Sequence, residues 1–233
     1  MLEQLKQQVL EANLELFKSG LIIQSFGNVS GIDRSNGLIV IKPSGVDYNK
    51  LKIDDMVVVD LQGNIVEGDK RPSSDTPTHI ELYKAFSGIG GITHTHSLYA
   101  TMFAQACRQI QCFGTTHADT FNGPVPITRY LRREEVEVDY EKNTGKVIIE
   151  RFKTLNPLEM PAVLVAGHAP FTWGKDPIES VKNAQTLEYV AQLAFGTLII
   201  NPQLKILPKY IIKKHFQRKH GPDAYYGQQN FNK

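Results

Sequence analysis

A His-Thr-His tripeptide at the end of a β-branched run constrains the fold of this chain more than any other feature. Residues 91–93 (Gly-Ile-Thr) lead into His94 and His96, and residues two apart on a strand point to the same face of a sheet. A second apolar run, residues 163–167, leads into His168. The pattern predicts strands that end at the rim of a pocket, where two imidazoles share one side and a third arrives from a distant segment.

Asp75 and these three histidines form a candidate set of metal ligands. Three imidazoles and one carboxylate match the nitrogen and oxygen preference of Zn²⁺, with Mn²⁺ or Co²⁺ as substitutes. The alternative is a group of solvated or core histidines, which fits a His-x-His pair on its own. The position of all three histidines at strand ends favours ligation. His79, within a helical stretch, is interpreted as a surface or core residue, and His117 stays ambiguous.

Composition places the chain in an ordinary globular class. Its 233 residues suit one α/β domain, and the net charge of +2 from 26 basic and 24 acidic residues gives no reason to expect nucleic acid or a membrane as partner. Residues 1–17 form an amphipathic pattern without the apolar segment of a signal peptide, so we expect a cytoplasmic protein. Cys107 and Cys112 are then expected to be reduced and unpaired. Basic residues near the C-terminus are interpreted as a solvated helix face or a local attractor of anions.

Hydrophobic periodicity predicts an alternation of helices and strands. Helices are expected at residues 2–19, 77–86, 99–106, 177–195 and 209–219. Strands are expected at residues 38–41, 56–60, 65–67, 91–96, 146–152 and 162–166, with a hairpin turn at residues 62–64. Strands dominate the middle of the chain and helices frame them, which indicates an α/β fold: a layered sheet with helices on its faces.

Three short loops have the composition of an anion site. They mix glycine or serine with amide or cationic donors, so that backbone N–H groups can approach phosphate oxygens while a lysine adds a point charge. Each loop also has an ordinary turn composition. The third runs directly into Asp75, which would place a phosphate close to a metal, as a small phosphorylated sugar needs. The candidate residues are Gly27, Asn28, Lys42, Ser44, Gly45, Ser73 and Ser74.

Motifs along nearly the whole chain resemble those of the L-ribulose-5-phosphate 4-epimerases. The matching segments are residues 27–30 (GNVS), 42–46 (KPSGV), 71–76 (RPSSDT), 94–97 (HTHS), 114–119 (GTTHAD) and 218–228 (RKHGPDAYYGQ). These enzymes belong to the class II aldolase/epimerase superfamily, which implies zinc dependence and a single-domain, three-layer α/β/α fold around a mainly antiparallel sheet. The resemblance also implies a homotetramer whose active sites lie between neighbouring subunits.

The resemblance assigns roles to residues that the pattern alone leaves as structural. It implies that Asp119 and Tyr226 are acid–base groups, with Tyr226 delivered by the C-terminal tail, about residues 220–233, of a neighbouring subunit. It also implies that Thr115 and His215 line the substrate site. Without the resemblance, Asp119 would be interpreted as a turn residue and Tyr226 as a terminal aromatic.

The identity of residue 75 separates the implied activity from that of related aldolases. Sister enzymes that cleave fuculose or rhamnulose 1-phosphate resemble this chain but have a glutamate base in place of Asp75. An aspartate there, together with Asp119 and the Tyr-Tyr-Gly-Gln tail, favours the epimerase branch. Two features depart from the family pattern: Phe26, where a tryptophan is more usual, and the extension at residues 229–233.

The implied reaction interconverts L-ribulose 5-phosphate and D-xylulose 5-phosphate. Because the hydrogen on C4 of the sugar is not acidic, the expected route breaks and re-forms the C3–C4 bond, with the metal as a Lewis acid. Proton donors and acceptors are then needed on both faces of the aldehyde fragment. Two alternatives stay open: an aldolase that stops at cleavage, and a non-catalytic module that binds a metal or a sugar phosphate. The chain has no glycine fingerprint for a nicotinamide cofactor.

Overall fold

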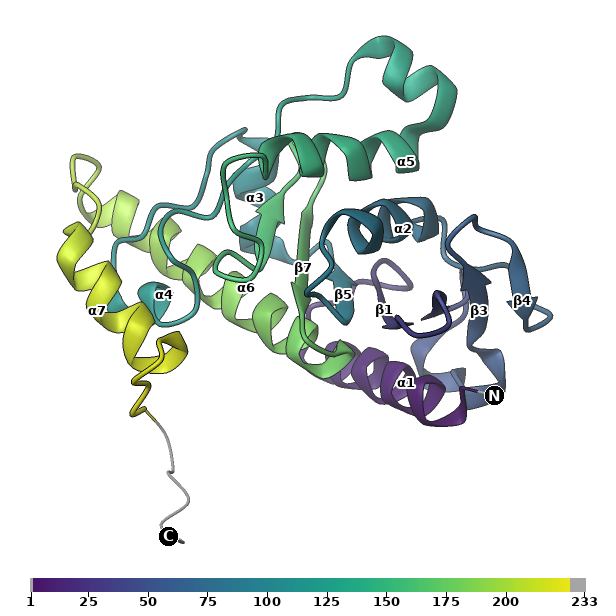
Figure 1. Ribbon diagram of the computed structural model, residues 1–233. Coiled ribbons are helices and arrows are strands. Elements are labelled where there is room, and N and C mark those ends of the chain that lie inside the picture. Colours follow the sequence, from purple (N-terminus) through teal and green to yellow (C-terminus); the bar gives the residue numbers. More distant parts are fainter. Residues whose placement is uncertain (1, 227–233) are drawn as a thin grey trace, which may run out of the picture.

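A seven-stranded sheet forms the centre of the computed structural model, which describes residues 2–226 (Figure 1). The strands are β1 (Asn28–Asp33), β2 (Leu38–Ile41), β3 (Val57–Asp60), β4 (Ile65–Glu67), β5 (Gly91–His94), β6 (Ala162–Leu164) and β7 (Pro170–Gly174). Their order across the sheet is β4-β3-β2-β1-β5-β7-β6, and every neighbouring pair is antiparallel. This arrangement confirms the expected antiparallel sheet.

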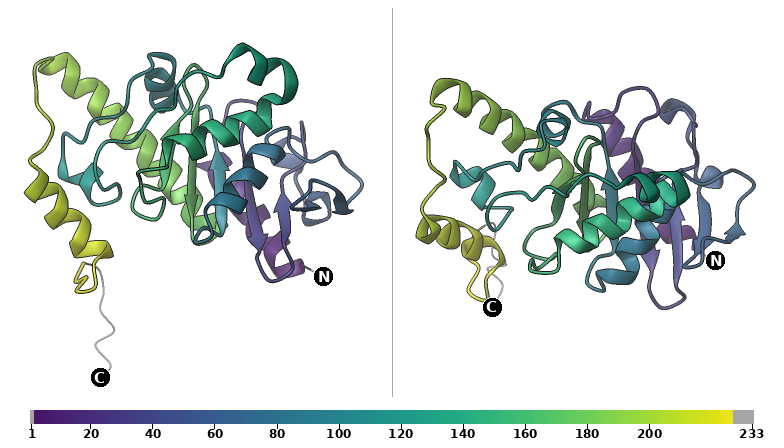
Figure 2. Two further views of the ribbon diagram at one scale, coloured as in Figure 1. Left: turned by 45° about the horizontal axis from the view of Figure 1, so that its top comes forward. Right: turned by 90° about the horizontal axis from the view of Figure 1, so that it is seen from above.

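Helices cover both faces of the sheet and produce the expected three-layer α/β/α architecture (Figures 1 and 2). One face carries α1 (Glu3–Lys18) and α6 (Pro177–Ile200), and the other carries α2 (Thr76–Ala85) and α5 (Arg133–Arg151). The remaining helices are α3 (Leu98–Gln105), α4 (Thr115–Ala118), α7 (Lys209–His220) and the short η1 (Tyr48–Lys50) and η2 (Ile53–Asp55). Both figures place α4 and α7 at the end of the molecule opposite β3 and β4.

Successive side chains of β1 point to opposite faces of the sheet. Val29 packs with Ala12 and Val181 beneath α1 and α6, whereas the Ser30 hydroxyl lies on the opposite face, 2.8 Å from the Tyr83 hydroxyl of α2. Because helices cover both faces of the sheet, side chains in the middle of every strand except the exposed edge strand β4 are buried. A cavity can therefore form only beyond the strand ends, where side chains leave the sheet.

The strand predicted at residues 146–152 is wrong, because residues 146–151 form the last turns of α5 and Phe152 is its C-cap. Its β-branched residues favour a strand locally, but Val147 and Ile148 are buried as part of a helix. Gly145 permits α5 to approach α2 closely, since a Cβ at this position would lie only 2.7 Å from the Glu81 Cβ. Tertiary packing therefore overrides the local propensity.

The sequence-based prediction also omits β1 and β7. Strand β1 lacks an apolar run because one face is polar and the other contains Gly31. A Cβ at Gly31 would lie 2.8 Å from side-chain atoms of both Leu5 and Pro177, so close helix packing excludes the side chain that would have marked a strand. The predicted helices correspond to α1, α2, α3, α6 and α7.

Two further expectations concern the cysteines and the membrane. Cys107 is exposed and Cys112 is buried, and both are free thiols. Within residues 2–226, no helix combines the length and apolar composition that crossing a membrane requires. The extension at residues 229–233 lies outside the described residues.

Candidate metal centre and a separate polar cluster

The three predicted histidine ligands converge at the ends of neighbouring strands. His94 is the last residue of β5, and His96 follows two residues later. His168 lies in the tight turn between β6 and β7, where its N–H donates to the Val165 carbonyl. Strand β5 pairs with β7, and His94 lies opposite Phe171. The turn that contains His168 therefore lies beside His94. One ring nitrogen from each histidine lies within 4.8 Å of the others, so the structure confirms that the three imidazoles form one group.

Burial and hydrogen bonding prepare these imidazoles for ligation. His94 Nδ1 donates to the Pro170 carbonyl at 2.9 Å, which leaves Nε2 as the lone-pair nitrogen, 3.2 Å from His96 Nε2. Burial lowers the pKa of His94 and of His168 to about 3, and it also lowers the pKa of His96. All three rings are therefore neutral at physiological pH. Because a neutral imidazole is the form that binds a metal, the donor set fits a divalent cation.

Asp75 lines the same cavity from the N-terminus of α2, although it lies outside the close group of three nitrogens. Its side chain makes no capping hydrogen bond to the helix. Instead, Asn28 Nδ2 donates to Asp75 Oδ2 at 2.7 Å. The carboxylate is thereby directed away from the helix backbone and toward strand β1. Its role as a fourth metal ligand stays a prediction.

The predicted anion loops meet beside the histidines. The Ser44 N–H donates to the Arg71 carbonyl at 2.9 Å, and the Ser73 N–H donates to the Lys42 carbonyl at 3.0 Å. These hydrogen bonds pair two loops that are about thirty positions apart in the sequence. All seven predicted anion-site residues line one cavity of about 370 Å³, together with Asp75 and the three histidines. Sequence reasoning therefore identified most of its lining.

Lys42 is the buried cation of this cavity. Only 1% of it is exposed, its Nζ donates to the Pro43 carbonyl at 3.3 Å, and the same atom lies 4.5 Å from the centre of the Tyr48 ring. Burial lowers the pKa of Lys42 to about 8, despite the opposing charge of Asp47. The ammonium group thus lacks a carboxylate partner within hydrogen-bonding distance among the described residues and is available to an anion that enters the cavity.

Gly27 shapes the wall of the cavity through its backbone. It has a φ of +107°, and a Cβ here would lie 2.8 Å from the His94 carbonyl oxygen. Only glycine permits the chain to pass so close to the end of β5. The preceding Phe26 is half exposed, and its ring centre lies 6.0 Å from that of His96. An aromatic residue therefore borders the metal centre at this position.

Sequence reasoning missed several lining residues, among them Tyr140 and Glu141. These two follow Asp139, whose non-helical backbone marks a kink within α5. The Tyr140 hydroxyl reaches to 3.5 Å from His168 Nδ1. Tyr140 and Glu141 belong to no local motif, so the sequence alone offers no signal for them. The Thr78 hydroxyl of α2 donates to the Glu141 carbonyl at this point.

A second polar cluster surrounds Asp119, immediately after α4. Arg218 donates from Nε to Asp119 Oδ1 at 2.9 Å and from Nη2 to Oδ2 at 2.7 Å. His215 Nδ1 donates to Oδ1 at 3.0 Å. Burial raises the pKa of Asp119, but the hydrogen bonds from Arg218 and His215 and the charges of Arg218 and Lys219 outweigh it and hold the pKa below its usual value. Asp119 is therefore ionised at neutral pH.

The other residues implied by the resemblance lie near this second cluster. Thr115 begins α4, and its carbonyl accepts the Asp119 N–H at 2.9 Å. The ring centre of Tyr226 lies 4.8 Å from the Arg218 guanidinium carbon. None of Thr115, Asp119, His215 and Tyr226 lines the cavity that holds the histidines. The predicted site residues thus form two groups, one at β5 and α2 and one at α4 and α7 (Figures 1 and 2).

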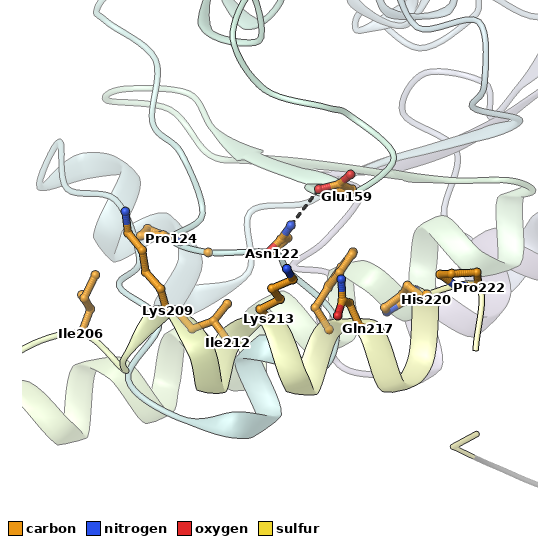
Figure 3. A pocket seen from close by; sticks show the side chains of 13 residues that line it. Asn122, Pro124, Glu159, Ile206, Lys209, Ile212, Lys213, Gln217, His220 and Pro222 are labelled. Atoms are coloured by element: carbon orange, nitrogen blue, oxygen red, sulfur yellow. Dashed lines mark hydrogen bonds between the residues drawn. The ribbon is translucent and has the colours of Figure 1, made fainter. Parts of the chain in front are cut away.

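A larger hollow of about 630 Å³ lies between α7 and the loop at residues 122–124 (Figure 3). The side of the hollow formed by α7 is lined by Lys209, Lys213 and Gln217. On the opposite side, Asn122 Nδ2 donates to Glu159 Oε2 at 2.7 Å. It contains none of the predicted site residues. The smaller cavity with the three imidazoles is therefore the candidate active site, on chemical grounds rather than size.

Comparisons with known proteins identify the family and the fold of this chain. Residues 7–195 match the family model described as the class II aldolase and adducin N-terminal domain. The fold is similar to that of an L-fuculose 1-phosphate aldolase, with a TM-score of 0.78 and 25% identity over 92% of this chain and 95% of that one. It is also similar to YgbL of Klebsiella pneumoniae, a candidate aldolase/epimerase/decarboxylase, with a TM-score of 0.73 and 27% identity over 92% and 99% of the two chains. The chain belongs to the class II aldolase and adducin family.

Proposed function

We propose that this protein is a metal-dependent sugar-phosphate enzyme, an L-ribulose-5-phosphate 4-epimerase that forms D-xylulose 5-phosphate. One observation carries the proposal: three neutral imidazoles, the Asp75 carboxylate and a buried Lys42, which forms no ion pair among the described residues, line one cavity of about 370 Å³. A cation at one end and a phosphate at the other would bind a short phosphorylated ketose along its length. The class II aldolase family supports sugar-phosphate chemistry of this kind.

The phosphate would bind at the paired loops. Lys42 supplies the charge, and the hydroxyl groups of Ser44, Ser73 and Ser74 supply directional donors, while the backbone N–H groups of Ser44 and Ser73 hold the two loops together. This end of the cavity also lies at the N-terminus of α2, where the dipole of the helix favours an anion. Gly27 and Gly45 leave room for the ligand beside these donors. The phosphate would thus keep the aldehyde fragment in the site after the sugar is cleaved.

The metal would be held by His94, His96 and His168, with Asp75 as the fourth ligand. Nitrogen and oxygen donors in this number favour Zn²⁺, and Mn²⁺ or Co²⁺ are the expected substitutes. When bound, the cation would supply Lewis-acid stabilisation of the negative charge that develops on the sugar oxygens. Asn28 holds the Asp75 carboxylate in place through its side-chain amide.

Inversion at C4 would proceed by cleavage and re-formation of the C3–C4 bond. The C4 hydroxyl gives its proton to one acid–base group as the bond breaks, and the electron pair of the bond stays with C3. The aldehyde fragment turns by half a turn, C3 attacks its other face, and a second group returns a proton to the C4 oxygen. We assign these two roles to Asp119 and Tyr226, which share contacts with Arg218.

A second copy of the chain would complete the site. Asp119 and Tyr226 lie at the α4 and α7 end of the molecule, away from the cavity with the histidines. Self-association is supported by apolar side chains that remain exposed along the C-terminal part of α6 and the segment after it: Tyr189, Leu193, Phe195, Ile199, Ile200, Leu204 and Ile206. We propose a homotetramer of single-domain chains, residues 1–233, each lending its C-terminal tail to a neighbour. A cytoplasmic location agrees with the two free thiols.

An aldolase is the second candidate, because the fold is similar to that of an L-fuculose 1-phosphate aldolase. The test compares two substrates with the same enzyme. Conversion of L-ribulose 5-phosphate to D-xylulose 5-phosphate, with no free aldehyde, is the result that the proposal predicts. Aldehyde release from L-fuculose 1-phosphate alone would assign the aldolase activity instead. Metal-loaded protein that converts neither compound would favour a non-catalytic binding module.

A further inference from the structure

Arg218 contacts both residues that the proposed function assigns to proton transfer. Its guanidinium group forms a two-point contact with the Asp119 carboxylate, at 2.9 Å from Nε and 2.7 Å from Nη2. The Tyr226 ring lies over the same group, with 4.8 Å between the guanidinium carbon and the ring centre. One side chain therefore connects the end of α4 to the C-terminal tail.

We propose that Arg218 is a positioning residue that fixes Asp119 and Tyr226 relative to each other. This inference rests on the proposed function, because it explains how two acid–base groups from distant parts of the chain act on one substrate. The planar fork of arginine is required, since it binds both carboxylate oxygens and stacks on an aromatic ring at the same time. A lysine would supply the charge without the second hydrogen bond.

The backbone around Arg218 supports this role. The Arg218 carbonyl accepts the N–H groups of both Tyr225 and Tyr226, at 3.0 and 3.1 Å, and these bonds fold the tail back onto the end of α7. His220 Nε2 donates to the Asp119 carbonyl at 2.8 Å and fastens the end of α4 to α7. Arg218 thus lies where three segments meet: α4, α7 and the tail.

The charges that face Asp119 come from α7. They are carried by Arg218 and Lys219 and by the titratable rings of His215 and His220. On α4 itself, His117 is turned away and donates from Nε2 to the Gly123 carbonyl at 2.8 Å. Helix α6 meets α4 with apolar side chains, among them Val190, Leu193 and Ala194. Arg218 is the group with two hydrogen bonds to the carboxylate, so its removal should change Asp119 most.

The first experiment measures kcat, KM and the pH profile of Arg218→Gln and Arg218→Lys on L-ribulose 5-phosphate. We expect kcat of Arg218→Gln to fall about 100-fold with KM within about twofold, because the acid–base group is misplaced while the substrate is held elsewhere. The acid limb of the kcat profile should move up by about one pH unit, since loss of a neighbouring cation raises a carboxyl pKa. Arg218→Lys, which keeps the charge, should lose activity with a smaller shift of the limb.

Lys213→Gln is the matched control, because it removes a positive charge from the same helix and Lys213 makes no contact with Asp119. Its kcat and pH profile should match those of the wild type. Melting temperature and oligomer mass are measured for every variant. A folded Arg218→Gln protein whose acid limb stays in place, or whose loss appears in KM alone, would overturn the positioning role.

A second measurement does not depend on turnover. Chymotrypsin cleavage after Tyr225 and Tyr226, followed by mass spectrometry, reports how firmly the tail is held. We expect the tail of Arg218→Gln to be cut about tenfold faster than that of the wild type or Lys213→Gln, because fast local opening exposes it. Equal cleavage rates would overturn the contact with the tail. Faster cleavage in a protein whose wild type converts no sugar phosphate would overturn the proposed function and leave Arg218 a purely structural contact.

Discussion

The two ring nitrogens of His94 have different roles. Nδ1 donates to the Pro170 carbonyl, while Nε2 faces His96 at 3.2 Å. The hydrogen bond fixes the tautomer of His94, and burial keeps its ring neutral. The lone pair on Nε2 is therefore available to a metal ion without any change in protonation. A single substitution here should therefore act on metal binding first and on turnover as a consequence.

The first prediction compares His94→Asn with Asp119→Asn. His94→Asn should weaken metal binding by at least about 100-fold and remove activity, since loss of a ligand exceeds the effect of losing a supporting contact. Asp119→Asn should keep its metal and lose about 10²- to 10⁴-fold in turnover, as expected for an acid–base group. Metal content after dialysis, measured by mass spectrometry, and turnover are determined on the same samples. An active, metal-free His94→Asn protein would refute the site assignment.

The second prediction concerns Lys42, whose pKa burial lowers from 10.5 to about 8. Between these two values the unfolded chain binds more protons than the folded protein, so this lysine makes stability rise with pH from about 8 to 10.5. Below that window the buried charge lowers stability. Lys42→Met should therefore leave the melting temperature at neutral pH unchanged or higher. It should raise KM about 10- to 100-fold, because a hydrogen bond to a charged group contributes about 1.5–3 kcal/mol.

Exposed Lys50 supplies the control for this prediction, since Lys50→Met removes the same charge outside the cavity. Its KM should equal that of the wild type. If Lys42→Met binds the sugar phosphate as well as the wild type does, the phosphate does not bind at the paired loops.

Among the elements of the fold, α5 is the one whose secondary structure the sequence predicted wrongly. The His-x-His strand, the long α6 and the Lys42 loop could be predicted from local patterns. In these segments the hydrophobic periodicity, the turn composition and the motifs all indicate the structure that is observed. In α5, the β-branched Val147 and Ile148 indicate a strand, and only contact with α2 makes the segment helical. Tyr140 and Glu141 were missed for the same reason, since the kink at Asp139 has no local signature.

The third prediction tests this packing. Gly145→Ala should lower the free energy of unfolding by about 1–3 kcal/mol, because the new Cβ would lie 2.7 Å from the Glu81 Cβ and the helices would have to separate. Gly196→Ala in α6 meets nothing within 4 Å and should change stability by at most about 1 kcal/mol in the stabilising direction. Chemical denaturation measures the free energy of unfolding of both variants. Equal effects would mean that Gly145 does not set the distance between α2 and α5.

In the whole molecule, the predicted site residues lie in two separate groups. Residue patterns predicted the ligands and the anion loops, which the structure gathers in one cavity. Asp119, His215 and Tyr226 could be proposed only from the resemblance, and they lie beside α4 and α7 rather than in that cavity. No pattern within one sequence reports which residues meet across a subunit boundary, because such contacts depend on symmetry.

The fourth prediction follows from this separation. Two inactive variants, His94→Asn and Asp119→Asn, are co-expressed with different tags, and mixed oligomers are purified through both tags. If each site combines two chains, random pairing should restore about a quarter of the wild-type activity, since about one site in four receives both intact halves. Mixed oligomers without activity would show that each site lies within one chain.

Turnover of L-ribulose 5-phosphate as a function of metal occupancy tests whether the three histidines hold a catalytic metal. The protein is stripped with a chelator, the metal is restored in steps with Zn²⁺, and bound metal per chain and formation of D-xylulose 5-phosphate are measured together. We predict that activity disappears with the metal and returns in proportion to occupancy, up to about one ion per chain, as a single three-histidine site requires. Full activity in the stripped protein, or metal binding that leaves turnover unchanged, would contradict the account.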